Sequence, residues 1–362
     1  MNNDRRVLAA MSGGVDSSVA ALLLAERGYD VTGVMMKLFE NEDIGEDILS
    51  SCCSLADRSE AEAAAAKIDV PFYVYNYAEE FRRGVMDYFA AEYCRGRTPN
   101  PCIECNRLLK FGALFWRADS LKCGFVATGH YARVERQNGR YLLRRSGDAR
   151  KDQTYALYFL TQEQLARTLF PLGEYTKPEV REIAARFGLP NAAKPDSEDI
   201  CFVPGGGYGA FLDLYTGEAS EPGDFVSADG AFLGRHRGYR NYTIGQRRGL
   251  GVSSGGKLYV AAIDPAANVV TLGPADELYG GSLVMTGINL IAADSLVGEV
   301  SCQAKIRYGA EPAPATARQT GADEITVTFR EPRRAITPGQ ACVLYDGDLV
   351  LGGGVIRSAS PS

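Results

Sequence analysis

Short apolar runs alternate with longer stretches of helical periodicity over the first 126 residues of the chain. The apolar runs that predict buried strands are Val7–Ala10, Val31–Met36, Phe72–Tyr75 and, with its exit loop, Phe125–His130. The stretches that predict helices are 19–27, 55–67 and 81–93. This order predicts a parallel sheet with helices on both faces, and ligands of such sheets gather at the carboxyl ends of the strands.

The pattern changes further along the chain. Residues 132–145 alternate around Asn138-Gly139, which predicts a β-hairpin. Helical patterns follow at 153–160, 163–169 and 177–187, the last with Thr176 as N-cap and Gly188 as C-cap. Beyond these, short alternating runs punctuated by glycine predict a small β-rich module with one helix and then an antiparallel barrel. We expect three domains, at residues 1–205, 206–280 and 281–362.

Composition limits the class of protein. The 362 residues exceed what one core organises, and 46% hydrophobic with 23% charged residues is a globular composition. No run of about 18 apolar residues and no signal-peptide core occurs, so we expect a soluble, cytoplasmic protein without a membrane partner. Nine cysteines, an odd number, favour reduced thiols, and two histidines argue against zinc-hydrolase and Ser/His/Asp chemistry.

The strongest single motif is the turn Met11-Ser12-Gly13-Gly14-Val15-Asp16-Ser17-Ser18, between a predicted strand and a predicted helix. Adjacent glycines let backbone N–H groups approach a phosphate, and the serine hydroxyls add donors at the positive end of the helix dipole. The turn lacks the lysine of a Walker loop and carries Asp16, which suits a cation such as Mg²⁺. The alternative is an ordinary Gly-Gly turn with Asp16 as a capping carboxylate.

The turn resembles the SGGxDS loop of the PP-loop ATP pyrophosphatases, and further segments extend the resemblance. These segments are SGGVDSS at 12–18, TPNP at 98–101 with Cys105-Asn106, TGHYAR at 128–133, KDQ at 151–153, DSEDICF at 196–202, YTIGQRRGL at 242–250 and TPGQ at 337–340. Together they resemble the tRNA-specific 2-thiouridylase family (MnmA, also called TrmU) over essentially the whole chain. The resemblance implies a parallel-sheet PP-loop domain of the adenine nucleotide alpha hydrolase-like α/β class, a small central β-rich tRNA-binding domain and a C-terminal antiparallel β-barrel.

The resemblance implies an ATP-dependent sulfurtransferase. In that family ATP adenylates O2 of the wobble uridine, position 34 of tRNA, and a persulfide sulfur then replaces the oxygen to give 2-thiouridine. The residues that match the ATP site, with Mg²⁺ as the accompanying ion, are Ala10, Met11, Ser12, Gly13, Gly14, Val15, Asp16, Ser17, Met36 and Gly129. An adenylate leaves more readily than a carbonyl oxygen, so spending ATP lowers the barrier to attack by sulfur.

Two cysteines match the catalytic pair of the family. Cys201 would carry the persulfide received from a sulfur donor, a cysteine desulfurase or a sulfur-relay protein, and Cys105 would act as the nucleophile through a transient disulfide bond. A position in the first turn of a helix and the neighbours Arg97 and Arg107 would favour the thiolate of Cys105. The alternative is that both are buried small hydrophobes. We adopt that alternative for six of the other cysteines, which are Cys52, Cys53, Cys94, Cys123, Cys302 and Cys342. One further cysteine is an exception.

The exception is Cys102, where members of the family often carry aspartate. Cys102 and Cys105 would share one side of a helix, and with Cys201 they could hold a [4Fe-4S] cluster with one open iron. A lone Cys-x-x-Cys is a weak metal signal, so persulfide chemistry is favoured and the cluster stays an alternative.

Contacts with tRNA follow from the resemblance and from one cluster of charge. The residues that match tRNA-contacting positions are Asn100, Pro101 and Cys102 at the target base, and His130, Lys151, Asp152, Gln153, Arg307, Tyr308 and Gln340 elsewhere. Residues 235–248 hold five arginines with Tyr239 and Tyr242 and no acidic residue, which suits phosphates and splayed bases. The target uridine would have to flip out of its stack.

Other functions stay open from the sequence. His130 could be a general base or a satisfied strand-end histidine. A PP-loop amidating ligase is disfavoured because no glutaminase domain is evident and the two loop cysteines would have no task. A non-catalytic RNA-binding adaptor with a nucleotide-sensing domain would bind both ligands without releasing pyrophosphate.

Overall fold

The computed structural model describes residues 5–40, 44, 55–196, 199–203, 207–252 and 256–361. By their contacts the chain forms two compact units. The first unit contains residues 1–85, 102–202 and 348–351, and the second contains 86–101, 203–347 and 352–362. Most of the acidic segment at 40–47, which the sequence predicts to be a solvated loop because it is rich in charge, lies outside the described residues, as do Cys52 and Cys53.

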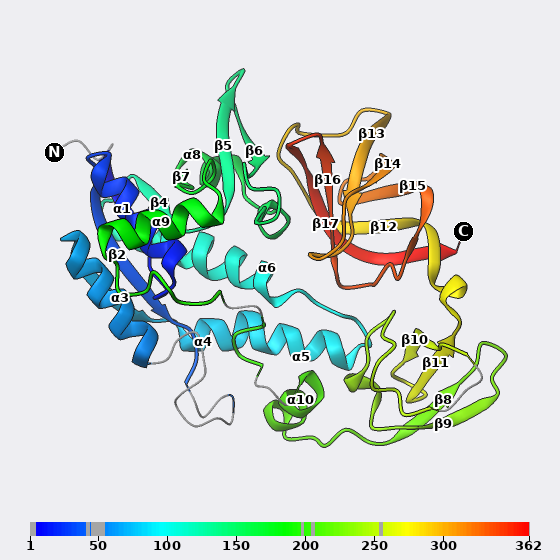
Figure 1. Cartoon of the computed structure of the whole chain (residues 1–362). Coiled ribbons are helices and arrows are strands. Elements are labelled where there is room, and N and C mark those ends of the chain that lie inside the picture. Colours follow the sequence, from blue (N-terminus) through cyan, green and yellow to red (C-terminus); the bar gives the residue numbers. More distant parts are fainter. Residues whose placement is uncertain are drawn as a thin grey trace. The chain divides into compact units, whose positions relative to one another are not determined.

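A sheet of five parallel strands forms the centre of the first unit, in the order β3-β2-β1-β4-β7 (Figure 1). The strands are β1 (Arg6–Ala10), β2 (Asp30–Lys37), β3 (Phe72–Asn76), β4 (Phe125–Ala127) and β7 (Thr168–Leu169). The predicted parallel α/β sheet is therefore confirmed. Its carboxyl edge is formed by the residues that follow each strand.

Helices cover the sheet on both faces. The α-helices of the first unit are α1 (Val15–Glu26), α3 (Leu55–Ile68), α4 (Ala78–Phe81), α6 (Pro101–Cys105), α7 (Leu114–Ser120), α8 (Gln162–Ala166) and α9 (Lys177–Phe187). Helix α1 contacts α3 and α9, and the three helices contribute to one apolar cluster with Val7 and Ala9 of β1. Leu8, which points to the opposite face, is also fully buried, and α7 contacts β1 and β4. A parallel sheet needs both faces covered in this way.

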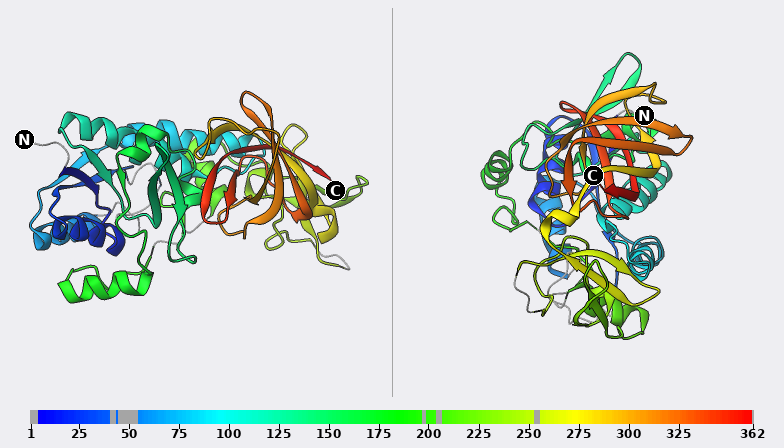
Figure 2. Two further views of the ribbon diagram at one scale, coloured as in Figure 1. Left: turned by 90° about the horizontal axis from the view of Figure 1, so that it is seen from above. Right: turned by 90° about the vertical axis from the view of Figure 1, so that its right-hand side faces the viewer.

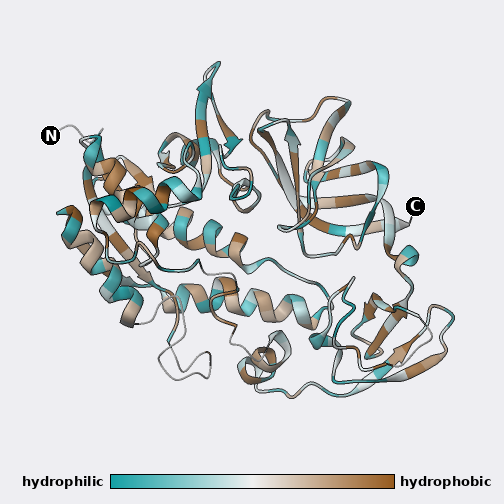
Figure 3. Ribbon diagram, viewed as in Figure 1, coloured by the Kyte–Doolittle hydropathy of each residue, from teal (hydrophilic) through white to brown (hydrophobic). Residues whose placement is uncertain are grey.

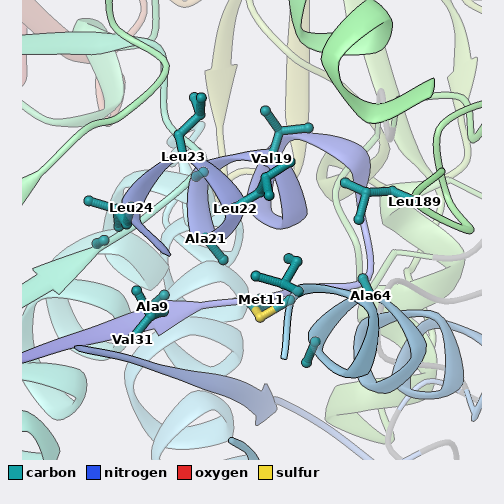
Figure 4. Packing of buried hydrophobic residues seen from close by; sticks show 14 of the residues in the cluster. Ala9, Met11, Val19, Ala21, Leu22, Leu23, Leu24, Val31, Ala64 and Leu189 are labelled. Atoms are coloured by element: carbon teal, nitrogen blue, oxygen red, sulfur yellow. The ribbon is translucent and has the colours of Figure 1, made fainter. Parts of the chain in front are cut away.

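The cluster on the α1 face contains aliphatic side chains from several segments (Figure 4). Met11 lies in this cluster between α1 and α3. It is the first residue of the turn 11–18, which we call the phosphate-type turn, so that turn begins with a core residue. Burial of a large aliphatic side chain contributes about 1.5–3 kcal/mol to the free energy of unfolding. The turn therefore starts from a fixed point in the core.

Helix α9 has the predicted bounds because its ends are specified locally. The carboxylate of Glu179 accepts hydrogen bonds from the backbone N–H and the hydroxyl of Thr176, at 2.7 and 2.8 Å. Gly188 ends the helix with φ +70°, a conformation that costs glycine little.

Three predicted helices differ from the structure. The stretch 153–160 contains only a short 3-10 turn over Thr154–Ala156 (η4), because Gln153, its first residue, hydrogen-bonds to the backbone of Tyr131 through both its N–H and its side chain. The stretch 163–169 ends as a helix at Ala166 and continues as β7, which pairs with β4. The stretch 81–93 is helical throughout, but it includes a π-helical segment, Arg82–Met86 (η2), before α5 (Asp87–Cys94).

The predicted hairpin is present as β5 (Ala132–Gln137) and β6 (Arg140–Arg145). Asn138 and Gly139 both have positive φ, at 51° and 80°, as a two-residue hairpin turn requires. Its tip is hydrophilic (Figure 3). Asp348, far along the chain, accepts hydrogen bonds from Arg133 of β5 and Arg144 of β6, at 2.9 and 2.7 Å. The segment 348–351 is thereby part of the first unit.

Among its described residues, the second unit contains two β structures, the α-helices α5 and α10 (Tyr208–Thr216), and the short 3-10 helices η5 (Tyr239–Asn241) and η6 (Ala275–Leu278). A small mixed sheet has the order β10-β11-β8-β9. Its strands are β8 (Gly223–Val226), β9 (Phe232–His236), β10 (Tyr259–Asp264) and β11 (Val269–Gly273). The predicted small β-rich module with one helix is confirmed.

Six antiparallel strands close into a barrel, because β12 pairs with both β15 and β17 (Figure 2). The strands are β12 (Tyr279–Leu290), β13 (Glu299–Lys305), β14 (Ala313–Gly321), β15 (Glu324–Arg334), β16 (Ala341–Asp346) and β17 (Leu349–Pro361). The predicted C-terminal barrel is confirmed. Among the described residues, no helix is long and apolar enough to cross a membrane.

Candidate functional site

The turn between β1 and α1 is closed by its own hydrogen bonds. The backbone N–H of Ser12 donates to Oγ of Ser17 at 3.1 Å, and that hydroxyl donates to the carbonyl oxygen of Gly14 at 3.0 Å. The first amides of α1 have no acceptor within the helix and lie at the positive end of its dipole. The turn is therefore preorganised to bind an anionic group such as a phosphate.

Two glycines let other segments approach this turn closely. A Cβ on Gly129, which follows β4, would lie 2.8 Å from the backbone nitrogen of Ser17. Gly13 has φ +81°, and a Cβ there would collide with the carbonyl oxygen of Asp57 in α3. Strands β2, β1 and β4 are neighbours, so the structure brings Met36, the turn and Gly129 to one edge of the sheet.

Asp16 binds two side chains from distant parts of the chain. Its carboxylate accepts hydrogen bonds from Nζ of Lys177 at 2.7 and 2.8 Å and from the hydroxyl of Tyr131 at 2.8 Å. Burial, followed by the negative charge of Asp16, raises the pKa of Tyr131, so the phenol keeps its proton and donates it. Sequence reasoning connected Asp16 with a cation; its cation in this structure is the ammonium group of Lys177.

Lys177 also links Asp16 to Asp196. Its Nζ lies 2.6 Å from Oδ1 of Asp196. The same carboxylate binds Arg181 through Oδ1 at 3.3 Å and Lys151 through Oδ2 at 2.6 Å. Burial opposes the charge on Asp196, but the hydrogen bonds from Lys151 and Lys177 outweigh it and lower the pKa of this carboxyl. An alternating chain of charges therefore runs from the phosphate-type turn to the segment that precedes Cys201.

Asn191 and Lys194 bind the same segment to the turn. The amide of Asn191 donates to the carbonyl oxygen of Gly13 and to Oγ of Ser18, both at 2.9 Å, and Lys194 forms ion pairs with Asp57 and Glu60 of α3. Sequence reasoning missed Asn191, Lys194 and Lys177. No local sequence pattern could predict that Asp16 pairs with Lys177, which lies 161 positions later in the chain.

Cys105 is the last residue of α6, which continues directly into a π-helical segment, Asn106–Ala113 (η3). The thiol is buried, and burial raises its pKa to about 11 although Lys110 opposes the shift. The expectation of a thiolate stabilised by the first helical turn and by two arginines is wrong for this structure. Arg107 instead forms an ion pair with Glu104, and Arg97 forms one with Glu92.

The segments that carry the two candidate cysteines pack on one helical stretch. Phe202, next to Cys201, is buried and its ring lies 5.5 Å from that of Phe81 at the end of α4. Three residues after Phe81, a Cβ on Gly84 would lie 2.5 Å from Cδ1 of Leu108, which is three residues after Cys105. Both cysteines therefore belong to neighbouring segments of the first unit, where Cys201 is half-buried.

The sequence also suggested that Cys102, Cys105 and Cys201 could hold an iron–sulfur cluster. All three lie within the described part of the chain, where no group of three or more Cys, His, Asp or Glu side chains is arranged to hold a metal ion. Cys102 is exposed whereas Cys105 is buried. The three thiols do not fit a cluster in this conformation. No cysteine in the described ranges forms a disulfide bond.

Several residues matched to tRNA contacts have structural partners in the first unit. The buried carboxylate of Asp152 accepts hydrogen bonds from Ser146 N–H and from the Thr154 hydroxyl, and Gln153 accepts one from Tyr131 N–H at 2.9 Å. His130 is buried and shares a 2.8 Å hydrogen bond with Thr128. Burial, followed by Lys110, lowers the pKa of His130 well below its usual range, so the ring is neutral.

In the second unit, Gln340 supports the segment that leads to Asn100 and Pro101. Its amide donates to the carbonyl oxygens of Thr98 at 2.8 Å and Pro99 at 3.2 Å. Arg307 and Tyr308, in contrast, are exposed after β13. These two side chains are accessible, whereas the side chain of Gln340 shapes the backbone.

The arginine cluster at 235–248 is only partly a surface. Arg240 is 7% exposed and donates to the carbonyl oxygen of Glu218, and Tyr242 is 3% exposed among Phe225 and His236. Arg235 forms an ion pair with Asp224. Only part of the cluster is therefore accessible, because Arg240 is buried against Thr216 and Glu218, whereas Tyr242 belongs to the core of the small sheet. Arg247 and Arg248 remain exposed.

Three family profiles match successive parts of the chain. They are described as a tRNA methyl transferase HUP domain at residues 5–205, a tRNA methyl transferase PRC-barrel domain at 209–274 and an aminomethyltransferase beta-barrel domain at 281–356. They match, in order, the parallel sheet, the small mixed sheet and the barrel.

Full-length relatives are also similar. The chain is 48% identical over 358 residues to a tRNA-specific 2-thiouridylase MnmA of Clostridioides difficile, covering 98% of this chain and 99% of the relative. It is 50% identical over 357 residues to the MnmA of Carboxydothermus hydrogenoformans, covering 98% of each.

Proposed function

Because the chain belongs to the tRNA-specific 2-thiouridylase family, we propose that it uses ATP to convert the wobble uridine of tRNA into 2-thiouridine. One observation carries the proposal beyond the similarity. A phosphate-type turn and two cysteine-bearing segments belong to the same compact unit, joined by the contacts of Lys177 and Asn191. Activation by a nucleotide and transfer of sulfur need these two groups within one site.

ATP is proposed to bind with its phosphates at the turn. The proposed nucleotide-binding residues are those at the carboxyl edge of the sheet, Ala10–Ser17, Met36 and Gly129. Mg²⁺ is bound in proteins by one or two carboxylates together with substrate phosphates, and Asp16, 31% exposed, offers such a carboxylate. When bound, the ion would neutralise charge on the phosphates. Attack by O2 of uridine on the α-phosphorus then forms the adenylate and releases pyrophosphate.

Sulfur is proposed to arrive as a persulfide on Cys201, delivered by a cysteine desulfurase or a sulfur-relay protein. Cys105 attacks Sγ of Cys201, and the bond to the outer sulfur breaks with its electron pair on the departing hydrosulfide. The hydrosulfide adds to C2 of the activated base, and AMP leaves with the former O2. The resulting disulfide between the two cysteines accepts two electrons from a thiol reductant before the next turnover. Because burial raises the pKa of Cys105, its thiol must lose a proton before this step.

The tRNA is proposed to contact both units. The proposed target-base residues are Asn100, Pro101 and Cys102, and the further proposed contacts are His130, Lys151, Asp152, Gln153, Arg307, Tyr308 and Gln340. For Asp152, Gln153 and Gln340, the hydrogen bonds described above support a role in shaping the backbone that meets the RNA. The exposed Arg307 and Tyr308 suit direct contacts with phosphate and base.

We retain the division into a catalytic domain at 1–205, a central tRNA-binding domain at 206–280 and a C-terminal barrel at 281–362. We also expect the enzyme to act in the cytoplasm, where tRNA and reduced thiols are present.

The proposal is tested by nucleoside mass analysis of tRNA after incubation with ATP and a persulfide donor. We expect 2-thiouridine with the unaltered protein and its loss in Cys105→Ser and Cys201→Ser. The matched control is Cys302→Ser in strand β13 of the barrel, which should retain activity. Full activity in both site variants would remove the proposed roles of the cysteines. Iron and sulfide analysis of anaerobically purified protein distinguishes a cluster from a persulfide.

Release of pyrophosphate tests the activation step separately. An ATP-dependent thiolation enzyme releases pyrophosphate when tRNA is present. A non-catalytic adaptor binds ATP and tRNA without releasing any. Pyrophosphate release that continues in Cys105→Ser while 2-thiouridine disappears would locate the defect after adenylation.

A further inference from the structure

A shallow surface depression of about 470 Å³, open to solvent and called the cavity below, is rich in positive charge in the second unit. It is lined by Gly245, Gln246, Arg247, Arg248, Tyr259 and Arg334. Within the ranges that the structure describes, none of the three arginines has an ion-pair partner. The chain as a whole has a net charge of −6, so three uncompensated guanidinium groups around one cavity attract an anion locally.

Arg334 is held against an aromatic ring rather than against a carboxylate. Its guanidinium carbon lies 4.3 Å from the centre of the Tyr259 ring. Its Nε and Nη2 atoms are buried and have no hydrogen-bond acceptor among the described residues. A guanidinium stacked in this way is fixed in orientation and retains donors for a planar or bidentate acceptor such as phosphate.

The loop that carries Arg247 and Arg248 is held in place by its own backbone. The N–H of Gly245 donates to the carbonyl oxygen of Val260 at 2.8 Å, and the N–H of Val260 donates to the carbonyl oxygen of Gln246 at 3.0 Å. Gly245 has φ +87°, and a Cβ there would lie 2.7 Å from Cβ of Ala335, next to Arg334. The loop and the end of β15 are thus in direct contact.

The side chain of Gln246 completes the turn. Its Oε1 accepts a hydrogen bond from Thr243 N–H at 3.1 Å, and its Nε2 donates to the carbonyl oxygen of Arg248 at 3.0 Å. Both polar ends of the amide are therefore used within the loop. The arginines are presented by a preorganised turn, which reduces the entropy lost when a ligand binds.

We propose that this cavity binds a phosphodiester group of the tRNA backbone. The inference rests on the proposed function for the identity of the RNA, and on the cavity alone for the phosphate chemistry. Three guanidinium groups read charge and geometry rather than base identity, so the site positions the RNA without selecting a sequence. Inorganic phosphate presents the same oxygen atoms, and the experiment separates the two sources.

The test measures tRNA affinity against salt concentration for the full-length protein. Arg247→Gln/Arg248→Gln removes two exposed charges from the cavity. Arg136→Gln/Arg318→Gln removes two charges from exposed positions that do not line it. We expect the cavity variant to bind tRNA at least about 10-fold more weakly and to lower the slope of log affinity against log salt by about 0.7–0.9 for each lost contact. The control variant should match the unaltered protein in both quantities.

The outcomes distinguish this inference from the proposed function. Unchanged affinity and slope in the cavity variant would overturn the inference, as would an equal effect in the control variant. Loss of inorganic phosphate binding with unchanged tRNA affinity would also overturn it, because the site would then bind a free ion. An unaltered protein that binds tRNA with the expected salt dependence but forms no 2-thiouridine would refute the proposed function and leave the cavity assignment standing.

Discussion

Nζ of Lys177 lies 2.7 Å from Oδ1 of Asp16 and 2.6 Å from Oδ1 of Asp196, so one ammonium group bridges the two carboxylates. Asp16 is in the first turn of α1, and Asp196 precedes the segment that carries Cys201. The contact joins the candidate nucleotide site to the candidate sulfur-carrying segment. Both carboxylates are about one-third exposed or less, whereas Lys177 is 10% exposed.

Replacing the bridging lysine tests this connection. Lys177→Met leaves two carboxylates near each other without their shared cation, and we expect a loss of about 1–2 kcal/mol in the free energy of unfolding and weaker ATP binding. Urea denaturation and equilibrium titration with ATP measure the two effects. Lys151→Met is the matched control, because Asp196 retains Lys177 and Arg181. Equal stability and ATP affinity in Lys177→Met and the unaltered protein would contradict the assigned role.

A methyl group at position 129 should disturb the phosphate-type turn. In Gly129→Ala the new Cβ would meet the backbone nitrogen of Ser17 at 2.8 Å, and backbone atoms have little freedom to move away. We expect ATP affinity to fall at least about 10-fold, a change of about 1.4 kcal/mol in binding free energy. Gly309→Ala, which meets no atom within 4 Å, should leave ATP affinity unchanged. An unaffected ATP affinity in Gly129→Ala would show that this contact does not shape the site.

The Cys105 thiol should be unreactive in the free protein at neutral pH. With a pKa of about 11, only about one thiol in ten thousand is ionised at pH 7. Alkylation by iodoacetamide, followed by peptide mass analysis, should accelerate about tenfold for each pH unit and continue to rise beyond pH 9. The sign for stability follows: a thiol pKa raised by folding stabilises the protein below about pH 9, and this contribution is lost as the pH rises toward 11. Levelling of the alkylation rate below pH 9 would contradict the raised pKa.

Both histidines should remain neutral near physiological pH. Burial is the largest cause that lowers the pKa of His130 and of His236. Their imidazole proton resonances should therefore show no titration between pH 6.5 and 8. A histidine pKa depressed by folding stabilises the protein above its unfolded value of 6.5, and this contribution is lost as the pH falls below that value. A resonance that titrates with a midpoint above 6.5 would refute the assignment for that residue.

The elements best predicted from the sequence are those whose ends are specified by neighbouring residues. Helix α9 has its N-cap, its N-terminal proline and its C-terminal glycine within the helix or next to it, and its predicted bounds agree with the structure. The stretch 153–160 has helical periodicity, but Gln153 pairs with Tyr131, 22 positions earlier, and the chain there forms one short turn. Such a contact between distant residues overrides local propensity.

The same distinction applies to the candidate site. The turn from Met11 to Ser18 is contiguous, so its residues were identified from the sequence. Lys177 and Asn191 reach it only after the chain has folded around the sheet, and neither has a local signal. The predicted ionisation of the Cys105 thiol is wrong for a similar reason. Its pKa depends on burial by the surrounding fold rather than on charged neighbours in the sequence.

The ion pairs of Asp348 with Arg133 and Arg144 bring a segment from near the C-terminus into the first unit, which is therefore discontinuous along the polypeptide chain. A polypeptide that stopped after residue 205 would contain the whole parallel sheet but would present the β5–β6 hairpin with two arginines lacking this carboxylate partner. During synthesis on the ribosome, the hairpin can therefore form its ion pairs with Asp348 only after nearly the entire chain has emerged. Excised versions of the nucleotide-binding half should lack these two ion pairs, even when everything else in them is correctly folded.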